Sequence, residues 1–232
     1  MASLTVENYV KMIYLIEQRS PHGAAVATGT IAHALEVSPG TVTGMLKTLS
    51  EADLATYIPY EGARLTPSGG RLALAVLRRH RLVELFLART LAMPWDEVHE
   101  EAENLEHAVS ERLVDRIDAF LGNPDVDPHG DPIPRADGSL AEPPGVPLST
   151  LGEGTIFRLA RVVDQGTAFL RYLADCGLHL ETMGRVIENR QASGAIVLGV
   201  GDRSVALGRD AADKVLVTPQ ADPSRPIGVP TG

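Results

Sequence analysis

Apolar residues recur at helical spacing through the first fifty positions of the chain. From Leu4 to Gln18 they return every three or four residues, which predicts a helix with Thr5 as its N-cap. Residues 28–36 and 39–49 predict two more helices, separated by a tight turn. Two short helices joined in this way indicate a helix-turn-helix motif.

The turn of the motif and the residues after it also have recognisable sequence signals. Ser38 is the expected N-cap of the second helix of the motif, and Pro39 is its first helical residue. Residues 54–67 then predict a short hairpin, or wing, and residues 68–91 predict a long basic helix. The order of helices and wing favours a DNA-binding domain, although such units also serve as plain interaction modules.

The second helix of the motif begins with small polar side chains, as the end of a recognition helix should. Ser38, Thr41 and Thr43 are expected to approach base edges, and Gly44 offers no side chain for reading them. Much of the specificity would then come from thymine methyl groups and DNA shape. The complete set of DNA-binding candidates is Thr28, Ser38, Pro39, Thr41, Thr43, Lys47 and Arg64, the last two as phosphate contacts.

An acidic segment follows, and its polar positions have the spacing of metal ligands. The segment predicts one helix over residues 96–119, on which positions 99, 103, 106 and 107 share a stripe at about 100° per residue. Upstream, one turn separates two more candidates on the long helix. The six candidates are His80, Glu84, His99, Glu103, Glu106 and His107. A set of imidazoles and carboxylates without thiolate suits Mn²⁺ or Fe²⁺ better than a tetrahedral zinc site. A solvated acidic face that binds no metal remains the alternative.

The last third of the chain changes to strand-like alternation. Residues 122–150 are rich in Pro, Gly and Asp and predict a linker, in whose first turn His129 is expected to make a structural hydrogen bond. After a strand at 155–163 and a helix at 168–177 with Gly177 as C-cap, four strands are expected at 183–188, 195–200, 203–207 and 215–218. These elements predict a small β-barrel.

The chain has 232 residues and a net charge of −9, but the charge is local. Residues 1–90 carry nine basic and seven acidic side chains, whereas residues 91–150 carry three and fourteen. The net negative charge repels DNA phosphates, and the acidic part of the chain attracts divalent cations. DNA binding could therefore depend on those cations. One cysteine, Cys176, excludes an internal disulfide. No apolar run reaches twenty residues and the first residues lack a signal-peptide pattern, so we expect a cytoplasmic protein without a membrane partner.

Several motifs together resemble the diphtheria toxin repressor family of metal-dependent transcription regulators, and most of all its manganese-transport branch. The motifs are Glu7-Asn-Tyr-Val-Lys11, Ser38-Pro-Gly-Thr-Val-Thr43, Leu65-Thr-Pro-Ser-Gly69, Arg79-His-Arg-Leu-Val-Glu84, Val98-His-Glu-Glu-Ala-Glu103, Leu105-Glu-His107 and His129-Gly-Asp-Pro-Ile-Pro134. The resemblance implies a homodimer formed through the helices after the wing. It also implies a metal-loaded form that binds a palindromic double-stranded DNA operator.

The same resemblance divides the candidate ligands into two groups. His80, Glu84 and His99 match one group, and the other contains Glu103, Glu106 and His107. Glu103 stands where the iron-responsive branch has Cys, and the loss of a soft ligand favours Mn²⁺ over Fe²⁺.

Two residues of the first helix depart from the family. Asn8 can offer only an amide oxygen to a metal ion, and Lys11 stands where manganese regulators have an acid. A protonated lysine cannot bind a cation. A second ion should therefore bind weakly.

The C-terminal part resembles the SH3-like domain shared with small ferrous-transport accessory proteins. In some relatives a loop of this domain donates ancillary ligands, for which Asp164 and Gln165 are the candidates here, with an ordinary turn as the alternative. The expected architecture is a mainly α N-terminal part and a small C-terminal β-barrel. Its expected domains are a winged helix-turn-helix (1–67), a helical metal-binding and dimerisation domain (68–134), a linker (135–150) and the SH3-like domain (151–232).

The expected function is that of a repressor that senses Mn²⁺, or alternatively Fe²⁺, and controls metal-uptake genes. No small-molecule substrate is expected. One alternative is an enzyme with a hydrolytic or oxidising metal centre, but no nucleophile motif or phosphate loop accompanies the ligands. Another is a winged-helix interaction protein that needs no metal.

Overall fold

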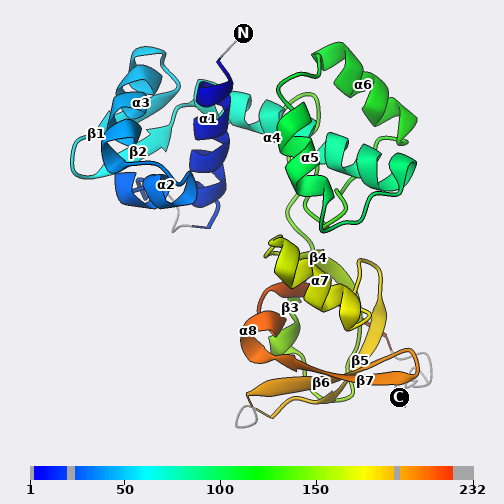
Figure 1. Cartoon of the computed structure of the whole chain (residues 1–232). Coiled ribbons are helices and arrows are strands. Elements are labelled where there is room, and N and C mark those ends of the chain that lie inside the picture. The colour runs from blue at the N-terminus through cyan, green and yellow to red at the C-terminus, as the bar shows by residue number, and fades with distance from the viewer. Residues whose placement is uncertain (1–2, 20–23, 191–193, 222–232) are drawn as a thin grey trace, which may run out of the picture. The chain divides into compact units, whose positions relative to one another are not determined.

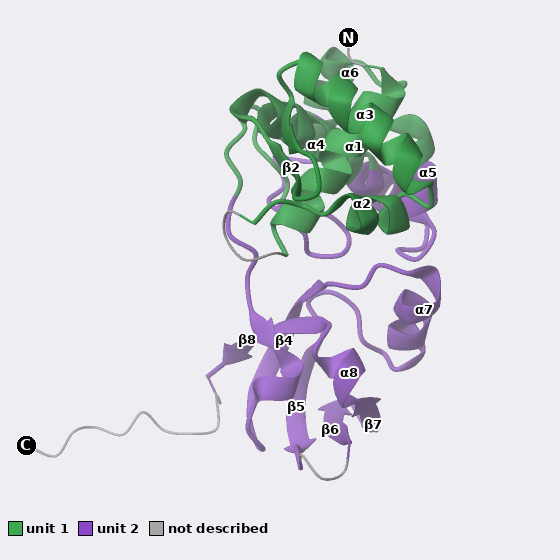
Figure 2. Cartoon of the chain, turned by 90° about the vertical axis from the view of Figure 1, so that its left-hand side faces the viewer, with its two compact units in different colours: residues 1–83, 103–119, 133–140 green, residues 84–102, 120–132, 141–232 purple. Residues whose placement is uncertain are grey.

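The structure, a computed structural model, describes residues 3–19, 24–190 and 194–221. These fall into two compact units (Figure 2). The first consists of residues 1–83, 103–119 and 133–140, and the second of residues 84–102, 120–132 and 141–232.

The elements confirm the expected order of helices, wing, helices and C-terminal sheet (Figure 1). The helices are α1 (Leu4–Glu17), α2 (Thr28–Ala34), α3 (Pro39–Glu51), α4 (Pro67–Leu91), α5 (Val98–Leu105), α6 (Glu111–Phe120), α7 (Thr167–Asp175), α8 (Arg209–Ala212) and the 3₁₀ turn η1 (Leu148–Thr150). The strands are β1 (Ala55–Ile58), β2 (Gly62–Leu65), β3 (Val146–Pro147), β4 (Ile156–Val162), β5 (Met183–Glu188), β6 (Ala195–Val200), β7 (Arg203–Gly208) and β8 (Val215–Gln220). None of the described helices is long and apolar enough to cross a membrane.

The first unit contains the winged helix. Helices α1 to α3 bury Ile13, Ile31 and Leu46 in one core. Ser3, and not the expected Thr5, caps α1, because its backbone is extended and its Oγ accepts a hydrogen bond from the amide of Val6.

The recognition helix and the wing form as the sequence predicts. Ser38 caps α3 by accepting a hydrogen bond from the Thr41 amide over 3.1 Å, with Pro39 in the first turn. Strands β1 and β2 pair antiparallel. Gly62 has a φ of +126°, and a Cβ there would lie 2.2 Å from the carbonyl oxygen of Val26. Only glycine allows this close approach, which fastens the wing to the segment before α2.

The acidic segment is not the single helix predicted over residues 96–119. It forms α5, which ends at Leu105, and α6, and the amides of Ala108 and Val109 in the turn between them donate to the Leu105 carbonyl. Ser110 then caps α6 through a 3.3 Å hydrogen bond from the amide of Leu113. Residues 106 and 107 therefore lie in a turn, and not on one helix with residues 99 and 103.

The second unit contains a six-stranded antiparallel sheet with the order β3-β8-β4-β5-β6-β7. Register shifts in β4 and β5 mark irregularities of the kind that bend a sheet. Among the described residues β3 and β7 stay unpaired to each other, so the predicted small barrel is an open one. Its core holds Phe157, Leu170 and Ile196, which come from β4, α7 and β6.

Candidate functional site

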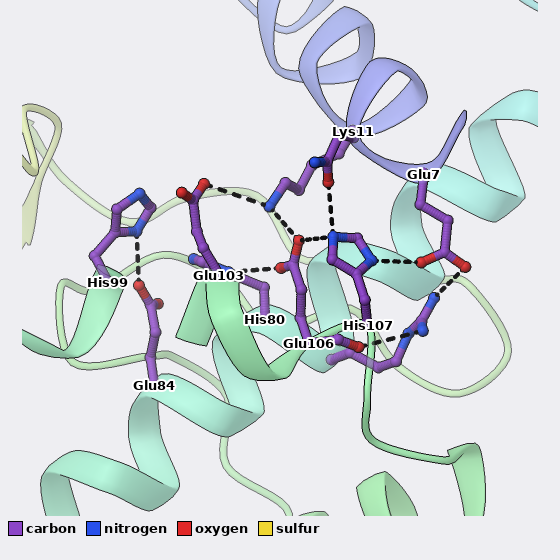
Figure 3. A network of polar contacts seen from close by, with 10 residues as sticks. Glu7, Lys11, His80, Glu84, His99, Glu103, Glu106 and His107 are labelled. Carbon is purple, nitrogen blue, oxygen red and sulfur yellow. Dashed lines mark hydrogen bonds and ion pairs between the residues drawn. The ribbon is translucent and has the colours of Figure 1, made fainter. Parts of the chain in front are cut away.

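Glu106 is the centre of a buried polar cluster in the first unit. It lies in the turn after α5, and its side chain is 1% exposed. Its Oε1 accepts a hydrogen bond from Nζ of Lys11 over 2.6 Å, and its Oε2 lies 2.7 Å from Nδ1 of His80 (Figure 3). Burial alone would raise the pKa of Glu106, but hydrogen bonds and charge from His80 and Lys11 outweigh it and lower that pKa.

His107 fastens the same turn to α1. Its Nδ1 lies 2.8 Å from Oε2 of Glu7, and its Nε2 lies 2.7 Å from Oδ1 of Asn8. Arg79 of α4 also donates a hydrogen bond to Glu7, over 3.0 Å. Glu106 and His107 are thus both engaged with α1, while Glu103 is 55% exposed and lies 3.8 Å from Lys11.

A second group of potential ligands surrounds Glu84 of α4 in the second unit. Oε1 of Glu84 lies 3.0 Å from Nδ1 of His99 on α5. His80 stands one turn before Glu84 on the same continuous helix, as the sequence predicts. The carboxylate is buried, whereas the His99 side chain is 42% exposed.

Asp127 and His129 belong to this group, although sequence reasoning did not select them as ligands. Atoms of Glu84, Asp127 and His129 lie within 4.8 Å of one another, and all three residues are buried. Nε2 of His129 makes the expected structural hydrogen bond, to the carbonyl oxygen of Trp95 over 2.7 Å. Because a carbonyl only accepts, Nε2 carries a proton, and Nδ1 faces Oε2 of Glu84 at 3.8 Å. The sequence did contain a sign of this group, because Asp127 and His129 lie two residues apart. They fall, however, in the segment predicted to be a linker.

The two ancillary candidates in the C-terminal domain have other partners. Oδ2 of Asp164 accepts a hydrogen bond from Lys214 over 2.8 Å. Gln165 donates from Nε2 to Oδ2 of Asp131 over 2.6 Å.

The DNA-binding candidates all lie in the first unit, on α2, α3 and the wing, where Thr28 and Thr43 are half-buried and the others are exposed. Thr28, Thr43 and Lys47 line a groove of about 580 Å³ together with Tyr57 and Tyr60. Oγ1 of Thr43 donates a hydrogen bond to the Pro39 carbonyl over 3.0 Å, and this contact is exposed. Arg64 projects from β2, at an exposed position. The set of Ser38, Pro39 and Thr41 forms the exposed first turn of α3.

Sequence comparison matches three consecutive parts of the chain to known families. Residues 1–63 match the family described as "Iron dependent repressor, N-terminal DNA binding domain", and residues 66–135 match "Iron dependent repressor, metal binding and dimerisation domain". Residues 146–219 match the FeoA domain. The iron-dependent repressor IdeR of Mycobacterium leprae is 32% identical over 92% of this chain and 96% of its own length.

Solved structures agree with this assignment. A manganese-dependent transcriptional repressor in complex with manganese is 40% identical, with a TM-score of 0.82 over 93% of this chain and all of the other. The manganese regulator SloR is 31% identical, with a TM-score of 0.73 over 93% of this chain and 98% of its own. The chain therefore belongs to the diphtheria toxin repressor and IdeR family, whose members are transcriptional repressors and not enzymes.

Proposed function

We propose that the protein is a homodimeric, Mn²⁺-dependent repressor that acts in the cytoplasm, binds palindromic operators and controls metal-uptake genes. The observation that carries this proposal is the donor group around Glu84, in a chain that also holds a winged helix-turn-helix. The proposed functional domains are residues 1–67, 68–134 and 151–232, with residues 135–150 as the linker.

His80, Glu84 and His99 would hold a divalent ion, with Asp127 and His129 beside the second oxygen of Glu84. Nδ1 of His80 is engaged with Glu106, so His80 would use Nε2. Imidazole and carboxylate donors without sulfur suit Mn²⁺ and also Fe²⁺. The manganese named for the solved relative favours Mn²⁺, and the iron named for IdeR keeps Fe²⁺ as the alternative.

Coupling to DNA requires that the ion binds the DNA-competent arrangement better than the others. In that arrangement the recognition helices of a dimer would lie about 34 Å apart, one turn of DNA. Exposed apolar side chains on α4 and α6, at Leu91, Leu113 and Phe120, support dimerisation through these helices. At each half-site Ser38, Thr41 and Thr43 would meet base edges.

The proposal is tested by selecting an operator from random duplexes in Mn²⁺ and comparing it with a scrambled duplex. Fluorescence anisotropy at about 0.15 M salt should show tight, sequence-dependent binding in Mn²⁺ and weak binding in a chelator. Equal affinity for both duplexes in Mn²⁺ would refute the repressor function. Equal operator affinity with and without metal would instead indicate a metal-independent DNA-binding protein, and a parallel series with Fe²⁺ decides between the two metals.

A further inference from the structure

Lys11 is buried on the inward side of α1, and this is unusual for a lysine. The residue is 7% exposed, and its Nζ lies 2.6 Å from Oε1 of Glu106 and 3.8 Å from Oε1 of Glu103 (Figure 3). Lysines are almost never this buried unless an anion pairs with them. Removal of one member of such a pair leaves an uncompensated buried charge. The Lys11–Glu106 contact is therefore part of how α1 is held in place.

Lys11 uses the oxygen atom that a metal ion would need from Glu106. Oε2 of Glu106 is engaged with His80, so Oε1 is the atom that faces α1. A bound divalent transition metal would approach this oxygen to about 2.0–2.2 Å. The ammonium group already lies in that direction and repels any cation brought close to it.

The two buried carboxylates of the cluster are each matched by a cation. Arg79 lies 3.0 Å from Glu7, and Lys11 lies 2.6 Å from Glu106. Glu103 and Glu111, which also approach these two cations, have exposed side chains, so water screens their charge. The cluster therefore has little buried charge left to attract a divalent ion.

We propose that the Lys11 ammonium is the resident cation of the Glu106 cluster, and that the protein binds its regulatory ion at the Glu84 group alone. α1 is then fastened to residues 103–107 at every metal concentration. The second part of this inference rests on the proposed metal-dependent function, whereas the occupancy of the Glu106 cluster by Lys11 does not.

The test counts the Mn²⁺ ions bound per chain by equilibrium dialysis in seven proteins. They are the wild type, Lys11→Met, Glu84→Gln, Glu84→Gln/Glu106→Gln, the double variant Lys11→Met/Glu84→Gln, this last double variant with Glu106→Gln added, and Lys47→Met. Methionine removes the charge without adding a strong ligand. Lys47, exposed on α3, is the control for loss of one positive charge.

We expect one saturable ion in the wild type and in Lys47→Met, and none in Glu84→Gln. Lys11→Met should gain one further ion. The double variant should keep that gained ion, and Glu106→Gln should abolish it. If Glu84→Gln still binds an ion that disappears when Glu106→Gln is added with Lys11 in place, the inference is wrong. If the wild-type ion stays bound both in Glu84→Gln and in Glu84→Gln/Glu106→Gln, the proposed metal site at Glu84 is wrong. An ion gained in Lys11→Met would still support Lys11 as the resident cation.

A second measurement avoids any variant that fails to fold. In the wild type, the ¹⁵N-labelled ammonium signal of Lys11 should be protected from exchange, and saturating Zn²⁺, a diamagnetic probe, should leave it in place. Loss of that signal into rapid exchange on addition of Zn²⁺ would show that an ion displaces Lys11, and would overturn the inference.

Discussion

Oε1 of Glu84 and Nδ1 of His99 lie 3.0 Å apart, so an imidazole on α5 contacts a buried carboxylate on α4. A metal ion that takes both atoms as ligands must break this contact, and the imidazole then carries its proton on Nε2. Since a metal ion binds only the neutral imidazole and the ionised carboxylate, metal binding at this group competes with protonation.

The affinity for Mn²⁺ should fall as the pH is lowered, by on the order of tenfold per pH unit for each proton displaced. Isothermal titration in two buffers of different ionisation enthalpy would count the protons. Glu84→Ala should weaken binding by more than about 100-fold, since even outer partners of metal ligands contribute about 10- to 100-fold. Glu101→Gln, an exposed acid on α5, serves as the control and should bind as the wild type does. An affinity that stays constant as the pH is lowered would remove the Glu84–His99 contact from the metal site.

His129→Ala should destabilise the metal-free protein by about 2–4 kcal/mol, because it opens a cavity and leaves the Trp95 carbonyl without its 2.7 Å hydrogen bond. Urea unfolding in a chelator would measure this. His179→Ala is a matched control, since this exposed histidine also touches the Trp95 ring, and its cost should stay below about 1 kcal/mol. If saturating Mn²⁺ stabilises wild type and His129→Ala equally, His129 is structural and not a ligand.

Most of the fold could be predicted because its elements depend on local signals. The Ser38-Pro39 cap set the start of α3, and strands β5 and β6 begin and end where their alternation does. The break between α5 and α6 could not be foreseen from periodicity. It depends on Ser110 as a cap and on tertiary contacts of residues 106 and 107 with α1.

Part of the candidate site could be predicted because it also depends on local sequence signals. Residue types and spacing selected His80, Glu84 and His99, two of which share one helix. The sequence showed only that Lys11 replaces an acidic ligand. Its ion pair with Glu106 could not be predicted, because the two residues are 95 positions apart in sequence. Asp127 and His129 lie in an irregular segment, which has no helical or strand periodicity. Their approach to Glu84 could therefore not be predicted from the sequence.

Gly62→Ala and Gly44→Ala should change stability in opposite directions. Alanine at position 62 would hold an unfavourable φ and meet the Val26 carbonyl, so a loss of about 1–3 kcal/mol is expected. Gly44 is exposed on α3 with open space around it, and alanine there should add up to about 1 kcal/mol of helix stability. Urea midpoints would show both effects. A neutral Gly62→Ala would mean that the wing does not pack on the segment before α2.

Glu17→Gln should make the winged helix less sensitive to pH. Burial raises the pKa of Glu17, against the lowering effects of the Leu65 amide, which donates to its Oε1 over 2.9 Å, and of Arg64. A raised pKa means that stability is complete below the unfolded value, about 4.3, and is lost as the pH rises through the folded value. Glutamine keeps the acceptor oxygen without the charge. The variant should therefore match protonated wild type in acid and exceed it at neutral pH in urea unfolding. If the free energies of unfolding of the variant and the wild type differ by a constant amount from acid to neutral pH, this prediction is wrong.

His107→Ala tests whether metal bound at the Glu84 group needs the fastening of α1 to the turn after α5 in order to act on DNA binding. The substitution removes the contacts of the turn after α5 with Glu7 and Asn8 of α1, while the core of the winged helix is untouched. The variant should stay folded and dimeric, and its operator affinity in saturating Mn²⁺ should fall by about 10- to 100-fold, toward the level in a chelator. His179→Ala, in the C-terminal unit, should bind the operator as the wild type does.

Charge neutralisation could mimic part of this loss, because any divalent ion on the acidic segment reduces repulsion from phosphates. That effect would raise affinity for every duplex and fade as salt is added. Positioning of the recognition helices should favour only a palindrome with the correct half-site spacing. Anisotropy titrations of His107→Ala and wild type on the operator, and on a version with five base pairs inserted between its half-sites, separate the two. One outcome would mean that the metal acts through charge alone: the affinity for both duplexes falls by the same factor, in both proteins, when salt is raised. The Glu7–His107–Asn8 contact would then have no part in the coupling.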